Sequence, residues 1–430
     1  MLSYVIILSE LIILILIKSL GFSEIDNMIA SLLIFIFSFS FLIDIQKSDR
    51  FTSYAEAITS GYLFRIFLLF FDLFGSNIRT LPQSGADSAS FYYNARELAI
   101  HGRANRESAF AKTMSYVFRV IGVNRLYGQF LLMLLSIVSL IVFILTVDGL
   151  NIKDSTKMRA VWIVCLLPNF ALLSSIFLRE SIITALITIS AYCIIQWMSG
   201  GNSLFAVAAI AFSTCSCLFH SGCIGITIGC IVCIMIYDYE AHRIHVSAGG
   251  ALLTVLIAFI ASFVFLNYGD SLLGKFGTIE TLSDIANTRE AGGSSYAKYV
   301  GNSNNPLSMV VFTIPRIIYF LFSPFPWQWR GGSDIIAFFF SGLFYLITIR
   351  NAIIFLRRGD RTNRGLVICL LIIAFFCTFI FAWGVSNVGT ASRHRDKMVC
   401  LYGIIYALTV GVNIKETDNT VNNTNSYLRE

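Results

Sequence analysis

Apolar runs of about 20 residues recur along the whole chain and are separated by shorter polar stretches. A helix of about 20 residues crosses the roughly 30 Å hydrocarbon core of a bilayer, so each run predicts a transmembrane helix. The pattern predicts an all-α polytopic membrane protein with about twelve transmembrane helices. The predicted spans are residues 2–20, 28–45, 55–74, 127–147, 158–177, 181–198, 204–219, 222–237, 247–266, 335–356, 366–385 and 398–412.

Basic residues in the short loops predict the orientation, because Lys and Arg concentrate on the cytoplasmic side of membrane proteins. They occur at 47–50, 153–159, 243 and 357–364. This distribution predicts that both termini are cytoplasmic. It also predicts that two enlarged loops, 76–125 and 267–334, are external.

Residues 307–325 form a further apolar run within the second external loop. Counting this run as a span would place the basic residues at 357–364 outside, against the orientation rule. The run also contains Pro315 and Arg316. We therefore predict a re-entrant or interfacial helix, because irregular backbone is tolerated at membrane depth only where protein or a cavity surrounds it.

The composition supports a membrane protein with one domain. Of 430 residues, 56% are hydrophobic and only 13% are charged, and a soluble chain of this size needs more polar surface. We expect a single transmembrane domain, 1–415, and a polar cytoplasmic tail, 416–430. The apolar N-terminus lacks a basic segment and a cleavage site, which predicts a retained first helix.

Other classes of function are disfavoured by where the charges and cysteines lie. The net charge of +6 comes from basic residues in short loops, so we expect no binding of nucleic acid. The ten cysteines lie in apolar segments and are interpreted as small buried hydrophobes, without a disulfide framework or a metal site. No cofactor is predicted.

The first external loop contains a candidate catalytic acid. From residue 88 the pattern is helical, with Phe91, Ala95 and Leu98 on one face, and Asp87 stands at the start. Asp87 is either a helix-capping acid or a general base or ion ligand in a cavity at the membrane surface. A second amphipathic segment, 109–121, is predicted to lie at the membrane interface.

Three further positions carry alternative interpretations. Arg179 and Glu180 interrupt two apolar runs; they form either a solvated turn or a fixed site for an anionic head group. Trp327 belongs either to an interfacial aromatic belt or to a surface that stacks on sugars. His220, between two short apolar helices, is either a hydrogen-bonded structural residue or a catalyst.

The densest charged segment is 387–397, which directly precedes the last predicted span. It contains Arg393, His394 and Arg395, and guanidinium groups match phosphate oxygens well. In the predicted topology this segment is external, where a positive run opposes the orientation rule and calls for a functional explanation. If the topology is inverted near the C-terminus, these residues are ordinary cytoplasmic anchors.

Together, the external side is predicted to carry both acids and arginines. The candidate catalytic residues are Asp87, Glu180 and His394. The candidate substrate-binding residues are Arg96, Arg179, Arg289, Arg316, Arg393, Arg395 and Trp327. Such a set suits an enzyme that acts on a lipid-linked diphosphate: arginines stabilise the leaving diphosphate, and a carboxylate or imidazole accepts a proton from the attacking sugar hydroxyl.

At these residues the chain resembles the Wzy-type O-antigen and capsule polymerases and the wider GT-C class of membrane glycosyltransferases. The resemblance rests on the external loop around Asp87 and Tyr92, on the segment 167–180 and on the run 389–395. In the GT-C class the early acid usually follows the first helix, whereas Asp87 follows the third predicted span.

The resemblance implies polymerisation of polyprenyl-diphosphate-linked oligosaccharide units at the outer leaflet of a bacterial inner membrane. It implies the lipid-linked glycan and membrane lipid as partners, with other polysaccharide-assembly membrane proteins as further candidates. Two alternatives stay open. One is a GT-C glycosyltransferase that adds a single sugar from a polyprenyl-phosphate donor. The other is a flippase or transporter, although transporters commonly show repeated halves and midplane charges, and we find no repeat.

Overall fold

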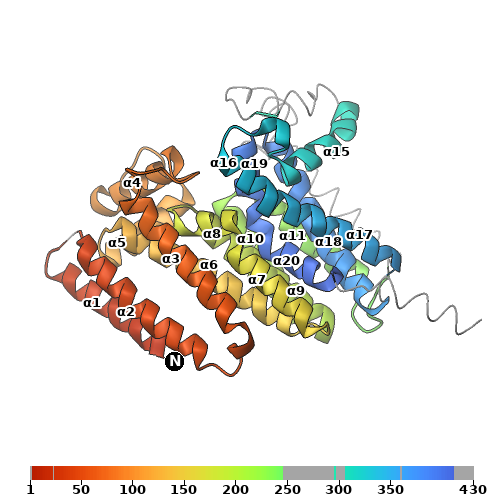
Figure 1. Ribbon diagram of the computed structural model, residues 1–430, viewed down its shortest axis with the longest axis horizontal. Helices are drawn as coiled ribbons and strands as arrows, with labels where there is room; N and C mark the ends of the chain where they lie inside the picture. Colours follow the sequence, from red (N-terminus) through yellow and green to blue (C-terminus); the bar gives the residue numbers. More distant parts are fainter. Residues whose placement is uncertain (1, 23, 246–294, 297–305, 359–360, 411–430) are drawn as a thin grey trace, which may run out of the picture.

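The computed structural model describes residues 2–22, 24–245, 295–296, 306–358 and 361–410 (Figure 1). The first half comprises α1 (Leu2–Ser19), α2 (Asn27–Gln46), η1 (Thr52–Tyr54), α3 (Ala55–Phe74), α4 (Ala86–His101), α5 (Ala109–Ile121), α6 (Arg125–Asp148), α7 (Asp154–Leu166), α8 (Pro168–Ser175), α9 (Glu180–Gly200), α10 (Ser203–Phe219), η2 (Ser221–Cys223) and α11 (Ile224–Ile236). The second half comprises β1 (Tyr237–Asp238), β2 (Arg243–Ile244), α15 (Pro306–Phe322), η4 (Pro326–Gln328), α16 (Gly332–Ile336), the π-helical turn η5 (Ala337–Gly342), α17 (Leu343–Arg358), α18 (Arg361–Gly384), α19 (Val388–Arg395), η6 (Asp396–Met398) and α20 (Val399–Thr409).

The described residues contain 7 helices long and apolar enough to cross a membrane, or 8 if the bent pair α7 and α8 forms one span. The two helices of that pair meet at 48°, where Pro168 opens α8 and prevents α7 from continuing. This supports an all-α polytopic membrane protein. The total of about twelve spans stays a prediction, because α10 and α11 are shorter apolar helices and residues 247–266 lie outside the described residues.

The last predicted span, 398–412, is a buried core helix. In α20 every residue from Val399 to Thr409 is buried, and the helix packs against α6, α7, α9, α17 and α18. A helix that is apolar on all sides lies either in the core of a large protein or among the spans of a membrane bundle. α20 has 11 residues and residues 411–412 lie outside the described residues, so a membrane span at 398–412 stays a prediction.

The N-terminal hairpin of α1 and α2 lies at one side of the bundle (Figure 1). Only 17% of the apolar window of α1 is buried, which is typical of a helix that faces lipid. Inside the hairpin the buried Glu10 accepts a hydrogen bond of 3.1 Å from Tyr127 of α6. This contact ties α1 to the core.

The two amphipathic segments of the first long loop form α4 and α5, which pack against each other. The predicted apolar face of α4 is confirmed, because Ala95 and Leu98 are buried there. The apolar face of α5 is covered by protein, including Phe177, and the position of α5 at the membrane interface stays a prediction. Gly85, and not Asp87, occupies the N-cap position of α4, and Asp87 lies in its first turn.

Candidate functional site

Side chains from three sequence-distant segments meet at one end of the bundle, where α3 ends and α9 begins. Arg393 of α19 donates from Nε to Glu180 Oε1 at 2.6 Å and from Nη1 to Asp87 Oδ2 at 2.6 Å. Lys397 of η6 lies 3.7 Å from the same oxygen of Glu180, and its Nζ lies 2.8 Å from His394 Nδ1. We call Asp87, Glu180, Arg393, His394 and Lys397 the charged cluster, and this end of the bundle the Asp87 end.

Local backbone features place these side chains. Asn387 caps α19 by accepting hydrogen bonds from the backbone N–H groups of Gly389 and Thr390, which sets where the helix begins. A short turn from Ile176 to Arg179 separates α8 from α9, and Glu180 is the first residue of α9. A carboxylate is favourable at that end of a helix because the helix dipole is positive there.

Arg393 is held as a cation between two carboxylates. Its side chain is 7% exposed and that of Glu180 is 3% exposed, whereas that of Asp87 is 69% exposed. Burial alone would lower the pKa of Arg393, but the nearby charges of Glu180 and Asp87 raise it above its ordinary value. The cluster therefore extends from a buried ion pair to a carboxylate at the surface.

The inner part of the cluster is desolvated, and burial there opposes positive charge on Lys397 and His394. Burial lowers the pKa of Lys397 to about 7; Glu180 opposes this shift, while the cations of Arg179 and Arg393 reinforce it. Burial likewise lowers the pKa of His394, and Lys397 lowers it further. The ring of His394 lies 4.6 Å, centroid to centroid, from that of His220, whose pKa is also lowered by burial. Both imidazoles are therefore expected to be neutral at pH 7.

Arg179 lies beside the charged cluster, and one N–H group of its guanidinium has no hydrogen-bond partner among the described residues. Its Nη1 donates to Phe219 O at 2.7 Å and its guanidinium lies over the ring of Phe91. Its Nε is buried and has no hydrogen-bond partner among the described residues.

Arg395 belongs to a second, wholly buried cluster. It donates to the backbone oxygens of Leu321 and Ser323, and Asp396 lies 3.8 Å from its Nε. Burial lowers the pKa of Arg395 and raises that of Asp396, although each partly offsets the other. Arg395 is 0% exposed and its hydrogen bond to Leu321 links α19 to α15, so the structure gives it a packing role, and its binding of substrate stays a prediction.

The other predicted binding residues lie apart from the charged cluster. Arg96 pairs with Glu24 at 2.6 Å on the surface. Arg316 is 0% exposed and stacks over Trp383, so it is a packing residue and not an accessible ligand. Trp327 is 63% exposed and stacks on Phe325, which leaves both of its interpretations open. Arg289 lies outside the described residues.

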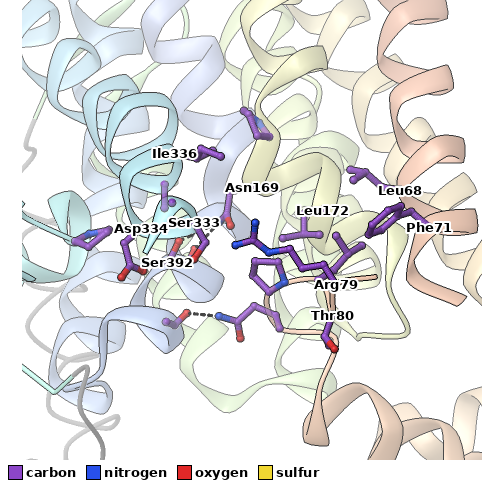
Figure 2. Close-up of a pocket in the computed structure, with 18 of the residues that line it drawn as sticks. Leu68, Phe71, Arg79, Thr80, Asn169, Leu172, Ser333, Asp334, Ile336 and Ser392 are labelled. Atoms are coloured by element: carbon purple, nitrogen blue, oxygen red, sulfur yellow. Dashed lines mark hydrogen bonds between the residues drawn. The ribbon is translucent and has the colours of Figure 1, made fainter. Parts of the chain in front are cut away.

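A cavity of about 470 Å³ lies at the Asp87 end, between α3, α8, α16 and α19 (Figure 2). Apolar residues of α3 form one wall, and the polar residues that line it are Arg79, Thr80, Gln83, Asn169, Ser333, Asp334 and Ser392. Asn169 donates to Ser392 Oγ at 3.1 Å and also to Asp396. Ser392 directly precedes Arg393, so the cavity and the charged cluster adjoin through α19.

Sequence reasoning missed four of these residues. Lys397 and Asp396 lie within the segment 387–397 that was singled out, but they were given no role, because nothing in a polar segment indicates that they are buried. Arg79 and Asp334 lie in loops without periodicity, and only the fold brings them to one cavity.

The donor set at this end does not resemble a metal site, since the described residues contain no group of three or more His, Cys, Asp or Glu side chains that could hold an ion. It consists of guanidinium and ammonium donors in contact with carboxylates. No model of a protein family, no curated protein and no solved structure matches the chain.

Proposed function

We propose that this protein is a membrane glycosyltransferase that polymerises oligosaccharide units carried on polyprenyl diphosphate, in the inner membrane of a bacterium. The observation that carries the proposal is the charged cluster, in which an exposed carboxylate rests on a buried ion pair beside an amphipathic cavity. A lipid-linked anionic sugar donor needs such a combination of base, cations and apolar wall.

In the proposed reaction Asp87 is the general base. One of its carboxylate oxygens, Oδ2, is held by Arg393, while Oδ1 forms no hydrogen bond with a described residue. Oδ1 accepts the proton as the hydroxyl oxygen of the acceptor sugar attacks the anomeric carbon of the donor. The bond from that carbon to the diphosphate oxygen breaks, and polyprenyl diphosphate leaves as an anion, stabilised by nearby cations.

Glu180 and His394 act as supports in this proposal. Both are buried within the charged cluster. The Oε1 oxygen of Glu180 forms ion pairs with both Arg393 and Lys397. They are positioning residues: Glu180 fixes the guanidinium of Arg393, which in turn holds Asp87, and His394 contacts Lys397. This differs from the catalytic roles predicted for them from the sequence.

The placement of charge favours an enzyme over a transporter. Glu180 and Arg393 lie at helix ends, whereas transport sites usually lie near the bilayer midplane. Arg65, in the middle of α3, is fully buried and donates to the carbonyl oxygens of Gly61 and Cys165. Its contacts tie α3 to α7, which is a structural role.

The test is gel analysis of surface glycan in cells that lack this gene and carry a variant. We expect Asp87→Asn, at normal membrane levels, to give single repeat units in place of a ladder. The matched control is Glu107→Gln, which removes another exposed acid of the same loop, paired with Lys112 at 3.0 Å, and should restore the ladder.

The other outcomes separate the alternatives. A truncated repeat unit in the deletion strain would indicate a single-sugar transferase. Accumulation of complete lipid-linked units on the cytoplasmic side would indicate a flippase. A normal ladder from Asp87→Asn would overturn its role as the base.

A further inference from the structure

The cavity at the Asp87 end has one apolar wall that continues onto the outer surface of the bundle. Phe64, Phe67, Leu68 and Phe71 of α3 line it. Phe67 is 60% exposed and lies in a helix that could cross a membrane. An apolar ligand in this cavity would therefore be continuous with the surrounding lipid.

A basic side chain, that of Arg79, lies at the polar end of the same cavity. The side chain of Arg79 points into the cavity toward Asn169 and Leu172, with Ser392 and Asp334 beyond (Figure 2). Arg79 forms no ion pair with a described residue, whereas Arg393 is held by two carboxylates at 2.6 Å. Its charge is thus available to a ligand.

The loop that carries Arg79 is held in an unusual conformation. Gln83 has a φ of 67°, a region that residues other than glycine rarely occupy. Its side chain donates to the backbone oxygen of Gly389 at 3.3 Å, which fastens the loop to α19. Strain of this kind persists where the surrounding structure fixes it, and it is common at ligand sites.

We infer that this cavity binds the phosphate head group of a membrane lipid, with Arg79 as its main ligand. The inference rests on the proposed function and deepens it, because it assigns the phosphate to Arg79 and not to the arginines of segment 387–397. The guanidinium of Arg79 meets two phosphate oxygens in the paired geometry that arginine favours. The hydroxyl of Ser392, whose oxygen already accepts from Asn169, can donate its proton to a third.

Asp334 sets the direction in which the ligand lies. Its Oδ2 accepts from the backbone N–H of Arg330 at 2.9 Å, which fixes a negative charge on the cavity wall formed by α16. A phosphate is repelled from this wall and drawn to Arg79, whereas sugar hydroxyls can donate to the carboxylate. The volume of about 470 Å³ suits a head group, since ligand pockets measure roughly 300–1,000 Å³.

The test measures binding to the full-length protein in nanodiscs. The probes are a short-chain polyprenyl monophosphate, the matching phosphate-free polyprenol and inorganic pyrophosphate. The variants are Arg79→Ala and Arg79→Lys, with Arg103→Ala as the control, because Arg103 is an exposed arginine of the same long loop and is not among the residues that line the cavity. Because Arg79 is exposed, its replacement should leave folding intact.

We expect Arg79→Ala to weaken binding of the polyprenyl monophosphate roughly 10- to 100-fold, the usual effect of losing a hydrogen-bonded charge. Arg79→Lys should restore part of the affinity, and Arg103→Ala should stay within about twofold. The polyprenol should bind weakly and with no dependence on Arg79. Unchanged binding by Arg79→Ala would overturn the inference, and so would pyrophosphate binding as tightly as the lipid.

Failure here is distinguishable from failure of the proposed function. If Asp87→Asn abolishes the glycan ladder but Arg79→Ala binds normally, the function stands and this site is wrong. If binding depends on Arg79 but deletion of the gene leaves the glycan unchanged, the site stands and the enzymatic proposal is wrong.

Discussion

The buried ion pair between Glu180 and Arg393 should contribute more to stability than any exposed pair of equal length. Its two side chains are 3% and 7% exposed and lie 2.6 Å apart. Two unit charges about 4 Å apart attract by about 4 kcal/mol at an effective dielectric constant of about 20. Removing one partner of a buried pair costs roughly 3–5 kcal/mol, because the other charge stays buried.

The perturbations are Glu180→Gln, Arg393→Met and the double variant, compared in a double-mutant cycle. Each single change should lower the free energy of unfolding by about 3–5 kcal/mol. The double variant should lose roughly 1–3 kcal/mol less than the sum of the two, because residues in contact couple by that amount. Glu180→Gln leaves Arg393 with Asp87 alone and leaves Lys397 without a carboxylate within 4 Å among the described residues.

The assay is denaturant unfolding of purified protein in detergent micelles, followed by fluorescence. The matched control is Arg96→Ala, because the Arg96–Glu24 pair has the same 2.6 Å separation but side chains that are 35% and 54% exposed. That change should cost at most about 1 kcal/mol. If Glu180→Gln costs no more than Arg96→Ala, the charged cluster does not hold the Asp87 end together and the reasoning fails.

Two further predictions concern pH and packing. Burial lowers the pKa of Lys397 from its ordinary value of 10.5 to about 7, so the unfolded protein binds more protons between these pH values and the stability of the folded protein should rise with pH through this window. Thermal unfolding at pH 7 and pH 9 should show the rise, and Lys397→Met should flatten it. An equal rise in the variant would contradict the assignment of this pH dependence to Lys397. Gly225→Ala should destabilise the protein by about 1–3 kcal/mol, because a Cβ there would lie 2.6 Å from Phe376 O and force α11 away from α18. Gly200→Ala, where a Cβ meets nothing within 4 Å, is the control, and equal midpoints of denaturant unfolding for the two variants would refute the packing argument.

The sequence predicted the helical architecture because long apolar runs carry a strong local signal. The spans at 2–20, 28–45 and 55–74 match α1, α2 and α3 to within a few residues. Whether the run at 398–412 crosses the membrane stays a prediction, because apolar residues that face lipid and apolar residues that face protein look alike in a sequence. Only the surrounding helices show that α20 is enclosed.

The site was predicted in part, from charges that interrupt apolar runs. Asp87, Glu180, Arg179 and Arg393 were singled out separately, and the structure brings them to one end of the bundle. Which of them stay accessible depends on packing between distant segments, so the burial of Arg395 could not be read from local pattern. For the same reason Arg79 was missed: a single arginine in an irregular loop has no distinguishing context until α8, α16 and α19 enclose it.

Reconstitution of the purified protein with a polyprenyl-diphosphate-linked oligosaccharide, followed by mass spectrometry of the products, would show whether the Asp87 end is an active site. We expect oligosaccharides of two or more joined units together with free polyprenyl diphosphate, and we expect neither from Asp87→Asn. Unchanged substrate in the presence of folded wild-type protein, or equal product from wild-type protein and Asp87→Asn, would contradict this conclusion.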